Sequence, residues 1–272
     1  MTLHEPSTGY DELLTLAVDV AREAAALVAE RRRAGVEVAD TKTSPTDVVT
    51  EVDHEAEAFL RHRLHELRPQ DGFLGEEGTG SDSSSGVTWV VDPIDGTVNF
   101  LYGMPHYAVS VAAVDGDQRS LAGAVVDVTR GEVFSAALGH GATLDAQEIR
   151  VRPTPPLRER MVITGYQYQP AVRRLQAPAV ARLVDHVRDV RRTGSAALDL
   201  CWVAAGRADA YVEEGLFIWD RAAAGLVAAE AGATVQVHTG VGGMDLVVAA
   251  PSDGFDEMWD LLVACGFAAP AD

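Results

Sequence analysis

The chain has 272 residues, which is enough for one large domain or two smaller ones. Hydrophobic residues make up 47% of it and the mean hydropathy is +0.02, so a packed core is expected and general disorder is excluded. The formal net charge of −19 repels nucleic acid and anionic membranes, which argues against both as partners. The same charge makes metal cations a natural class of ligand.

Two helices are predicted at the start of the chain. Apolar residues recur at helical spacing through residues 10–33 and again through residues 50–67. Gly35 ends the first pattern, and Pro69 closes the second. Each segment is therefore expected to bury one apolar face.

The pattern then changes twice along the chain. Strand-like segments separated by turn residues fill residues 71–151, whereas helical and strand-like segments alternate after residue 152. The predicted strands are 71–75, 87–91, 107–114, 121–128, 131–138, 161–165, 187–192, 210–214, 234–239 and 246–250, and the predicted helices are 170–187, 194–206, 219–233 and 254–265. We expect two lobes, residues 1–151 with the N-terminal helices and a strand-rich block and residues 152–272 with alternating α/β structure, which share an interface because no long linker separates them.

Cysteine usage and the N-terminal sequence both favour a cytoplasmic protein. Cys201 and Cys265 each lie in an apolar, helix-like context outside any zinc-binding spacing, which predicts reduced, buried thiols. The first 14 residues, MTLHEPSTGYDELL, lack the basic and apolar regions of a secretory signal. No apolar stretch is long enough to cross a bilayer without interruption.

The segment VVDPIDGTVNF, residues 90–100, concentrates polar chemistry behind an apolar strand. Pro93 restricts Asp92 to extended conformations, and Gly96 permits a tight turn or the close approach of a ligand. The carboxylates of Asp92 and Asp95, with the carbonyl of Ile94 between them, are the oxygen ligands that Mg²⁺ prefers. Spacing alone still favours a solvent-exposed type I turn over a site, because Asp, Pro and Gly are all common in such turns.

Other acidic residues also have ordinary structural explanations when each is taken singly. Asp53 follows Thr50 by three residues, which is the spacing of a helix capping box. Asp220 stands at a predicted helix start, where a negative charge complements the helix dipole. Glu76 ends a strand-like segment and could be a charged loop edge. None of these residues indicates a catalytic site alone.

Taken together, the motifs resemble those of the inositol monophosphatase family. The segments GEE, WVVDPIDGTVNF, GSAALDLCWVAAGRADAYVEEG and WDRAAAGLVAAEAG occur in the order typical of that family and cover most of the chain. The resemblance implies an α/β fold, a layered αβαβα sandwich of the sugar-phosphatase type. It also implies a Mg²⁺-dependent, lithium-sensitive phosphomonoesterase that forms a homodimer and holds two or three Mg²⁺ ions per site.

The resemblance also implies a role for individual residues. One Mg²⁺ would be held by Glu76, Asp92 and the Ile94 carbonyl, a second by Asp92, Asp95 and Asp220, and a third, weaker one by Glu76 and water. Thr97 and Asp53 would position and deprotonate the water that attacks the phosphate. The residues expected to contact substrate are Gly96 and Thr97 at the phosphate, and Gly194, Ser195, Ala196 and Glu213 at the alcohol.

The expected reaction is hydrolysis of a small polyol phosphate, myo-inositol 1-phosphate first, by a water molecule that the metal ions activate. Glu213, seven residues before Asp220, matches a position that holds a ring hydroxyl in the family, although it could equally be a solvated acid. The segment GYQYQ, which begins at Gly165, departs from the family pattern, so the resemblance does not predict the rim of the substrate pocket. Alternatives are histidinol phosphate or another small phosphate ester, and, in another class, a metal-binding regulatory or interaction protein with residual phosphatase activity. Arg191 and Arg192 could serve a second phosphate, but pairing with surface acids is the favoured expectation.

Overall fold

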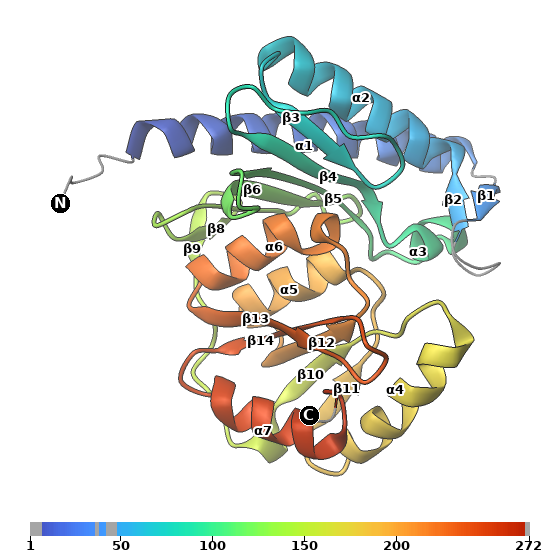
Figure 1. Cartoon of the computed structure of the whole chain (residues 1–272), viewed down its shortest axis with the longest axis vertical. Helices are drawn as coiled ribbons and strands as arrows, with labels where there is room; N and C mark the ends of the chain where they lie inside the picture. Colours follow the sequence, from blue (N-terminus) through green and yellow to red (C-terminus); the bar gives the residue numbers. More distant parts are fainter. Residues whose placement is uncertain (1–6, 36–37, 42–47, 270–272) are drawn as a thin grey trace.

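A computed structural model describes residues 7–35, 38–41 and 48–269, and these form five stacked layers (Figure 1). Two long helices cover the outer face of a seven-stranded sheet, two helices form the middle layer, a five-stranded sheet follows, and two more helices cover its far face. The layered αβαβα arrangement expected from the resemblance is therefore confirmed. The signal-peptide argument rests on the first 14 residues, and residues 1–6 of these lie outside the described residues.

The outer helical layer is α1 (Ser7–Ala34) and α2 (Glu51–Leu67), joined through the small pair β1 (Val38–Thr41) and β2 (Val48–Thr50). The sheet beneath them has the order β3-β4-β5-β6-β7-β8-β9. Its strands are β3 (Gly72–Gly75), β4 (Thr88–Asp95), β5 (Ala108–Val114), β6 (Ser120–Asp127), β7 (Val133–Ala137), β8 (Ala142–Leu144) and β9 (Gln147–Ile149). The short helix α3 (Thr97–Tyr102) follows β4 directly.

The second sheet has the order β11-β10-β12-β14-β13. Its strands are β10 (Met161–Thr164), β11 (Asp189–Arg191), β12 (Ala210–Glu214), β13 (Ala233–Thr239) and β14 (Asp245–Pro251). The middle layer is α5 (Ala196–Ala204) and α6 (Ile218–Glu230), and the far layer is α4 (Pro170–Leu183) and α7 (Phe255–Cys265), with a 3₁₀ turn at Leu157–Glu159.

Most of the elements predicted from the sequence are present, with three differences. Strand β4 continues through Asp95 instead of ending at residue 91, because the DPID segment still pairs with β5 across an irregular register. Helix α4 ends at Leu183, four residues early. The short pairs β1–β2 and β8–β9 were not predicted, since segments of three or four residues carry too little periodic pattern.

A shared core joins the two halves of the chain. The central cluster contains Val90 and Phe134 from the first sheet, Leu200 and Val227 from the middle helices, and Tyr211 from the second sheet, all at most 1% exposed. Because the middle helices come from residues after 152 and pack on a sheet built before it, this central core is shared, although each half also has a buried cluster of its own. The division at residue 151 stays a prediction.

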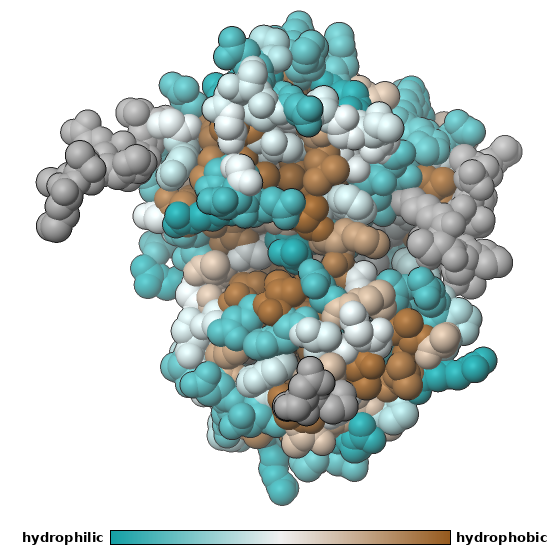
Figure 2. All heavy atoms as spheres, in the orientation of Figure 1, coloured by the Kyte–Doolittle hydropathy of each residue, from teal (hydrophilic) through white to brown (hydrophobic). Residues whose placement is uncertain are grey.

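The surface carries both hydrophilic and hydrophobic regions. Hydrophilic side chains cover much of the face in Figure 2, with hydrophobic residues gathered in patches near its middle and lower right. Cys201 and Cys265 are both buried and unbridged, as expected. None of the helices in the described part of the chain combines the length and hydrophobicity that a bilayer crossing requires.

The close packing of α6 on the first sheet leads to a stability prediction. A Cβ atom at Gly123 of β6 would lie 2.8 Å from the Cα of Ala223. We expect Gly123→Val to lower the free energy of unfolding by about 1–3 kcal/mol in urea denaturation, because the two layers must separate. Gly116→Val is the matched control, since nothing lies within 4 Å of a Cβ there, and it should change stability by less than about 0.5 kcal/mol. Equal effects would contradict this account.

Candidate active site

Three aspartates from two elements converge between the first sheet and the middle layer. Asp92 and Asp95 lie near the end of β4, and Asp220 lies in the first turn of α6. Each of the three offers a carboxylate oxygen, and these oxygens all lie within 4.8 Å of one another. Asp92 and Asp95 are buried, and Asp220 is half-buried. The structure thus brings together residues that are 128 positions apart in the sequence, from 92 to 220.

The local sequence of β4 explains how its two carboxylates reach the same point. The pairing of β4 with β5 loses its regular register between Asp92 and Asp95, where Pro93 has no N–H group to donate. The Oδ1 atom of Asp92 accepts a hydrogen bond from the Ile94 N–H at 3.0 Å. Gly96 then turns the chain with a φ of 96°, and a Cβ there would meet the carbonyl oxygen of Gly194 at 3.0 Å. Glycine is needed at this position on both counts.

The start of α5 holds Asp95 in place. Its carboxylate accepts hydrogen bonds from the Ser195 hydroxyl at 2.5 Å and from the Ala197 N–H at 2.7 Å. Ser195 is 1% exposed and does not line the cavity, although the sequence placed it among the substrate contacts. Its position in the structure is therefore that of a support for Asp95, whereas Gly194 and Ala196 on either side do line the cavity.

Thr97 and Asp53 meet as the resemblance implies. The Thr97 hydroxyl lies 3.1 Å from Oδ1 of Asp53 and 3.0 Å from the carbonyl oxygen of Ile94. The other oxygen of Asp53 accepts hydrogen bonds from the backbone N–H and the hydroxyl of Thr50, which completes the capping box of α2. The helix-capping role of Asp53 is therefore compatible with its contact with Thr97, because each uses a different carboxylate oxygen.

Burial and mutual repulsion shape the titration of the acidic residues. Burial, followed by the negative charges of Glu76, Asp95 and Asp220, raises the pKa of Asp92 well above its ordinary value. Burial raises the pKa of Asp95 to about 6, although its hydrogen bonds from Ser195 and Ala197 act in the opposite direction. These carboxylates repel one another unless a cation lies among them. An oxygen-only set of this kind fits a hard divalent cation such as Mg²⁺.

The acidic cluster opens into a cavity of about 310 Å³, which is the size of a small-ligand site. Glu213 lies in its wall and accepts a hydrogen bond from the Tyr211 hydroxyl at 2.8 Å. Burial raises the pKa of Glu213 to about 7, so the carboxylate predominates only above that pH. A Cβ at Gly165 would collide with this carboxylate, which explains the glycine that opens the GYQYQ segment.

The cavity also contains residues that the sequence did not assign to it. Arg191 pairs with Asp189 at 2.6 Å, as expected, but Arg192 lines the cavity. The other unassigned lining residues are Tyr166, Gln167, Tyr168, Gln169, Glu214, Gly215, Leu216, Phe217, Trp219 and Met244. Phe217 is exposed and stacks on Trp219 with ring centroids 4.9 Å apart. The departure of GYQYQ from the family pattern was the one sequence signal for this rim.

All but two of the predicted site residues lie on this cavity. The lining includes Glu76, Asp92, Ile94, Asp95, Gly96, Thr97, Gly194, Ala196, Glu213 and Asp220. Asp53 lies behind Thr97 and Ser195 lies behind Asp95. The geometry therefore joins an acidic cluster suited to a cation, a hydroxyl paired with a carboxylate, and a cavity with a further acid and an arginine.

We expect the metal-free cluster to destabilise the fold, which thermal unfolding can measure. Asp92→Asn keeps an acceptor for the Ile94 N–H but removes a buried charge, so the metal-free variant should melt above the wild type, by about 2–4 °C for each kcal/mol relieved. Millimolar MgCl₂ should raise the melting temperature of the wild type and leave that of the variant nearly unchanged.

The matched control is Asp127→Asn. This aspartate is also buried, but its carboxylate pairs with Arg130 at 2.6 Å outside the cluster. Its substitution should lower the melting temperature and preserve the response to MgCl₂. A wild type that is insensitive to MgCl₂ would contradict the metal site.

Comparisons with known proteins agree with this site. A model of the inositol monophosphatase family matches residues 9–266. The inositol-1-monophosphatase of Mycobacterium leprae is 49% identical, and the match covers 90% of this chain and 91% of that protein. The Nus factor SuhB of Haemophilus influenzae is 36% identical over 93% of this chain and 96% of that protein. Among solved structures, Mycobacterium tuberculosis SuhB has a TM-score of 0.83 and 44% identity, covering 96% of this chain and 99% of that one.

Proposed function

Since the chain belongs to the inositol monophosphatase family and is a phosphoric monoester hydrolase, we propose that it hydrolyses small polyol phosphate monoesters with Mg²⁺, and myo-inositol 1-phosphate first among them. The observation that carries the proposal is the cluster of Asp92, Asp95 and Asp220 beside the Thr97–Asp53 pair, in the wall of a cavity of about 310 Å³. The name of the M. leprae relative supports inositol 1-phosphate as the first substrate to test.

The proposed cofactor is Mg²⁺, with two or three ions held by Glu76, Asp92, the Ile94 carbonyl, Asp95 and Asp220. When bound, Mg²⁺ would neutralise phosphate charge and make water a better nucleophile. This solves the electrostatic problem of a chain with a net charge of −19 that must admit an anion. The chain's own acids then bind the cations, and Arg192 adds a positive charge at the cavity wall.

Thr97 and Asp53 are proposed to orient the attacking water. The Thr97 hydroxyl can donate to Oδ1 of Asp53, which leaves its oxygen free to accept a hydrogen bond from water. The water oxygen forms a bond to phosphorus, the bond from phosphorus to the alcohol oxygen breaks, and the departing alcohol takes up a proton from solvent. The proton that the water loses passes toward Asp53, whose pKa burial raises.

The alcohol would lie against Glu213 and the backbone of Gly194 and Ala196. Above pH 7 the Glu213 carboxylate can accept hydrogen bonds from two hydroxyls, one from Tyr211 and one from substrate. This favours polyols over esters without free hydroxyls. The aromatic rim made by Tyr166, Phe217 and Trp219 is compatible with additional small phosphate esters, including histidinol phosphate.

Three wider expectations remain predictions. The homodimer, the cytoplasmic location and the absence of a nucleic-acid partner rest on the family resemblance, the reduced cysteines and the negative charge, respectively. The naming of some relatives as Nus factors keeps an interaction role open as a second candidate. Turnover separates the two functions, because an interaction protein needs none.

The direct test is phosphate release from a panel of esters, measured with and without MgCl₂. We expect the highest kcat/KM for inositol 1-phosphate, lower values for histidinol phosphate and glycerol phosphate, and no turnover after chelation of the metal. A higher value for another ester would replace inositol as the substrate. The absence of turnover on every ester would favour the interaction role.

Thr97→Ala separates water positioning from metal binding. We expect kcat for inositol 1-phosphate to fall by about 100-fold or more, because the attacking water loses its hydrogen-bond acceptor. The Mg²⁺ concentration that gives half-maximal activity should change by less than about threefold, since the side chain is not proposed to be a ligand. Thr15→Ala, on the exposed side of α1, is the control. Loss of metal affinity without loss of kcat would remove Thr97 from this role.

A further inference from the structure

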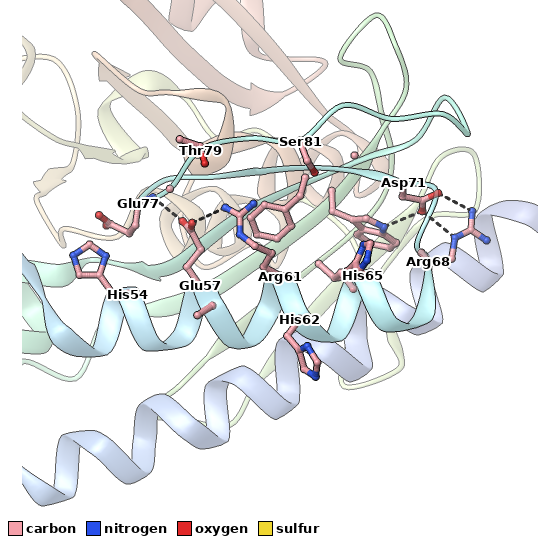
Figure 3. Close-up of a pocket in the computed structure, with 16 residues that line it drawn as sticks. His54, Glu57, Arg61, His62, His65, Arg68, Asp71, Glu77, Thr79 and Ser81 are labelled. Carbon is pink, nitrogen blue, oxygen red and sulfur yellow. Dashed lines mark hydrogen bonds and ion pairs between the residues drawn. The ribbon is translucent and has the colours of Figure 1, made fainter.

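A buried glutamate on α2 faces the loop that carries Glu76. Glu57 is only 4% exposed, and it lies in the wall of a second pocket, of about 700 Å³, which runs along α2. Its Oε2 atom accepts a hydrogen bond from the backbone N–H of Glu77 at 2.6 Å, and its Oε1 atom accepts one from Arg61 at 3.1 Å (Figure 3). A buried carboxylate needs such partners, because an unpaired charge is costly there.

The loop after β3 is fastened at its base as well. Phe73 and Ser81 exchange backbone hydrogen bonds of 3.1 and 2.8 Å, which closes residues 74–80 into a loop. The guanidinium of Arg61 lies 4.1 Å from the centre of the Phe73 ring and so fixes the arginine that pairs with Glu57. The bond from Glu77 to Glu57 therefore anchors the loop between its two ends.

Two glycines let the carboxylate approach the loop this closely. A Cβ at Gly75 or at Gly78 would collide with the Glu57 carboxylate, and one at Gly78 would also lie 2.9 Å from Arg61. The loop backbone thus fits around the glutamate on both sides of Glu77. In the sequence GEEG, residues 75–78, the two outer glycines leave room for the Glu57 carboxylate, and the second glutamate supplies the N–H group that donates to it.

Adjacent loop residues face opposite cavities. Glu76 lines the cavity that contains the aspartate cluster, whereas Glu77 lines the pocket along α2. The peptide unit between them is planar, so the hydrogen bond that holds the Glu77 N–H also restricts the backbone of Glu76. The Glu76 side chain in turn interacts with Asp92, whose pKa its negative charge raises.

We propose that Glu57 is a positioning residue that holds Glu76 in place to bind metal, with Arg61 holding Glu57. The inference rests on the proposed function, because it takes Glu76 as a metal ligand. Glu57 touches neither the aspartate cluster nor the cavity and acts through the loop backbone. A substitution at Glu57 should therefore weaken metal binding while the ligands themselves remain.

Binding of Mn²⁺ to the full chain, followed by the electron paramagnetic resonance signal of the free ion, tests this directly. Glu57→Ala should weaken Mn²⁺ binding about tenfold, the lower end of what loss of a supporting residue costs. Glu57→Gln keeps an oxygen that can accept from the Glu77 N–H and should remain within about threefold of the wild type. Glu55→Ala is the matched control, since Glu55 lies on α2 and pairs with Arg31 away from the loop.

Activity adds a second readout. For Glu57→Ala, the Mg²⁺ concentration for half-maximal release of phosphate from inositol 1-phosphate should rise about tenfold, with KM for the ester at saturating Mg²⁺ changed less than about twofold. A general loss of stability would not produce this split. If Glu57→Ala fails to fold, Gly78→Ala replaces it, because its methyl group displaces the same carboxylate from an exposed loop position.

Glu76→Ala distinguishes this inference from the proposed function. If Glu76→Ala weakens Mn²⁺ binding and Glu57→Ala or Gly78→Ala does not, Glu57 is only a buried ion pair and the inference is overturned. If Glu76→Ala itself leaves Mn²⁺ binding unchanged, the ligand assignment in the proposed function fails first. Equal losses in Glu57→Ala and Glu57→Gln would also overturn the inference, because the backbone hydrogen bond would then not matter.

Discussion

Mutual repulsion among buried carboxylates is the constraint around which the rest of this structure is organised. Asp92, Asp95 and Asp220 bring their oxygens within 4.8 Å of one another, and the first two are buried. Each is kept there by a local donor: the Ile94 N–H for Asp92, the Ser195 hydroxyl for Asp95 and the Phe217 N–H for Asp220. These bonds occupy part of each carboxylate and leave its remaining lone pairs for the cation that we propose. The fold thus keeps a site whose stability depends on what it binds.

The layered architecture follows from the same requirement. Asp53 comes from the outer helical layer, Asp92 and Asp95 from the first sheet, and Asp220 from the middle layer. Contacts between layers therefore set the distances within the site, and a shift of one layer would separate the ligands. The small residues at the interface, such as Gly123 against Ala223, permit the close approach that this needs. Packing contacts far from the cavity therefore help to set the distances between the residues that line it.

Local patterns were enough to predict much of the fold and part of the site. The DPIDGT segment, the capping box at Thr50 and the long amphipathic helices are all encoded within a few adjacent residues, and the motif order linked them to a family. Such local patterns did not predict how side chains from distant parts of the sequence are placed relative to one another. Ser195 lies next to Gly194 in sequence but faces Asp95, and Arg192 faces the cavity while Arg191 does not. Side-chain direction at such positions depends on packing partners a hundred residues away.

The glutamates use a different solution to the problem of buried charge. Glu57, Glu213 and Glu214 each lie against glycines, Gly75 and Gly78, Gly165, and Gly240 and Gly242, at which a Cβ would collide with the carboxylate. Two of them accept a short backbone hydrogen bond there, Glu57 from the Glu77 N–H at 2.6 Å and Glu214 from the Gly242 N–H at 2.7 Å. At Glu57 and Glu214 a backbone N–H stabilises the charge, and at Glu57 the guanidinium of Arg61 adds to this. Glu57 and Glu214 thus find their partners within the protein, whereas Asp92, Asp95 and Asp220 keep carboxylate oxygens for the proposed cation.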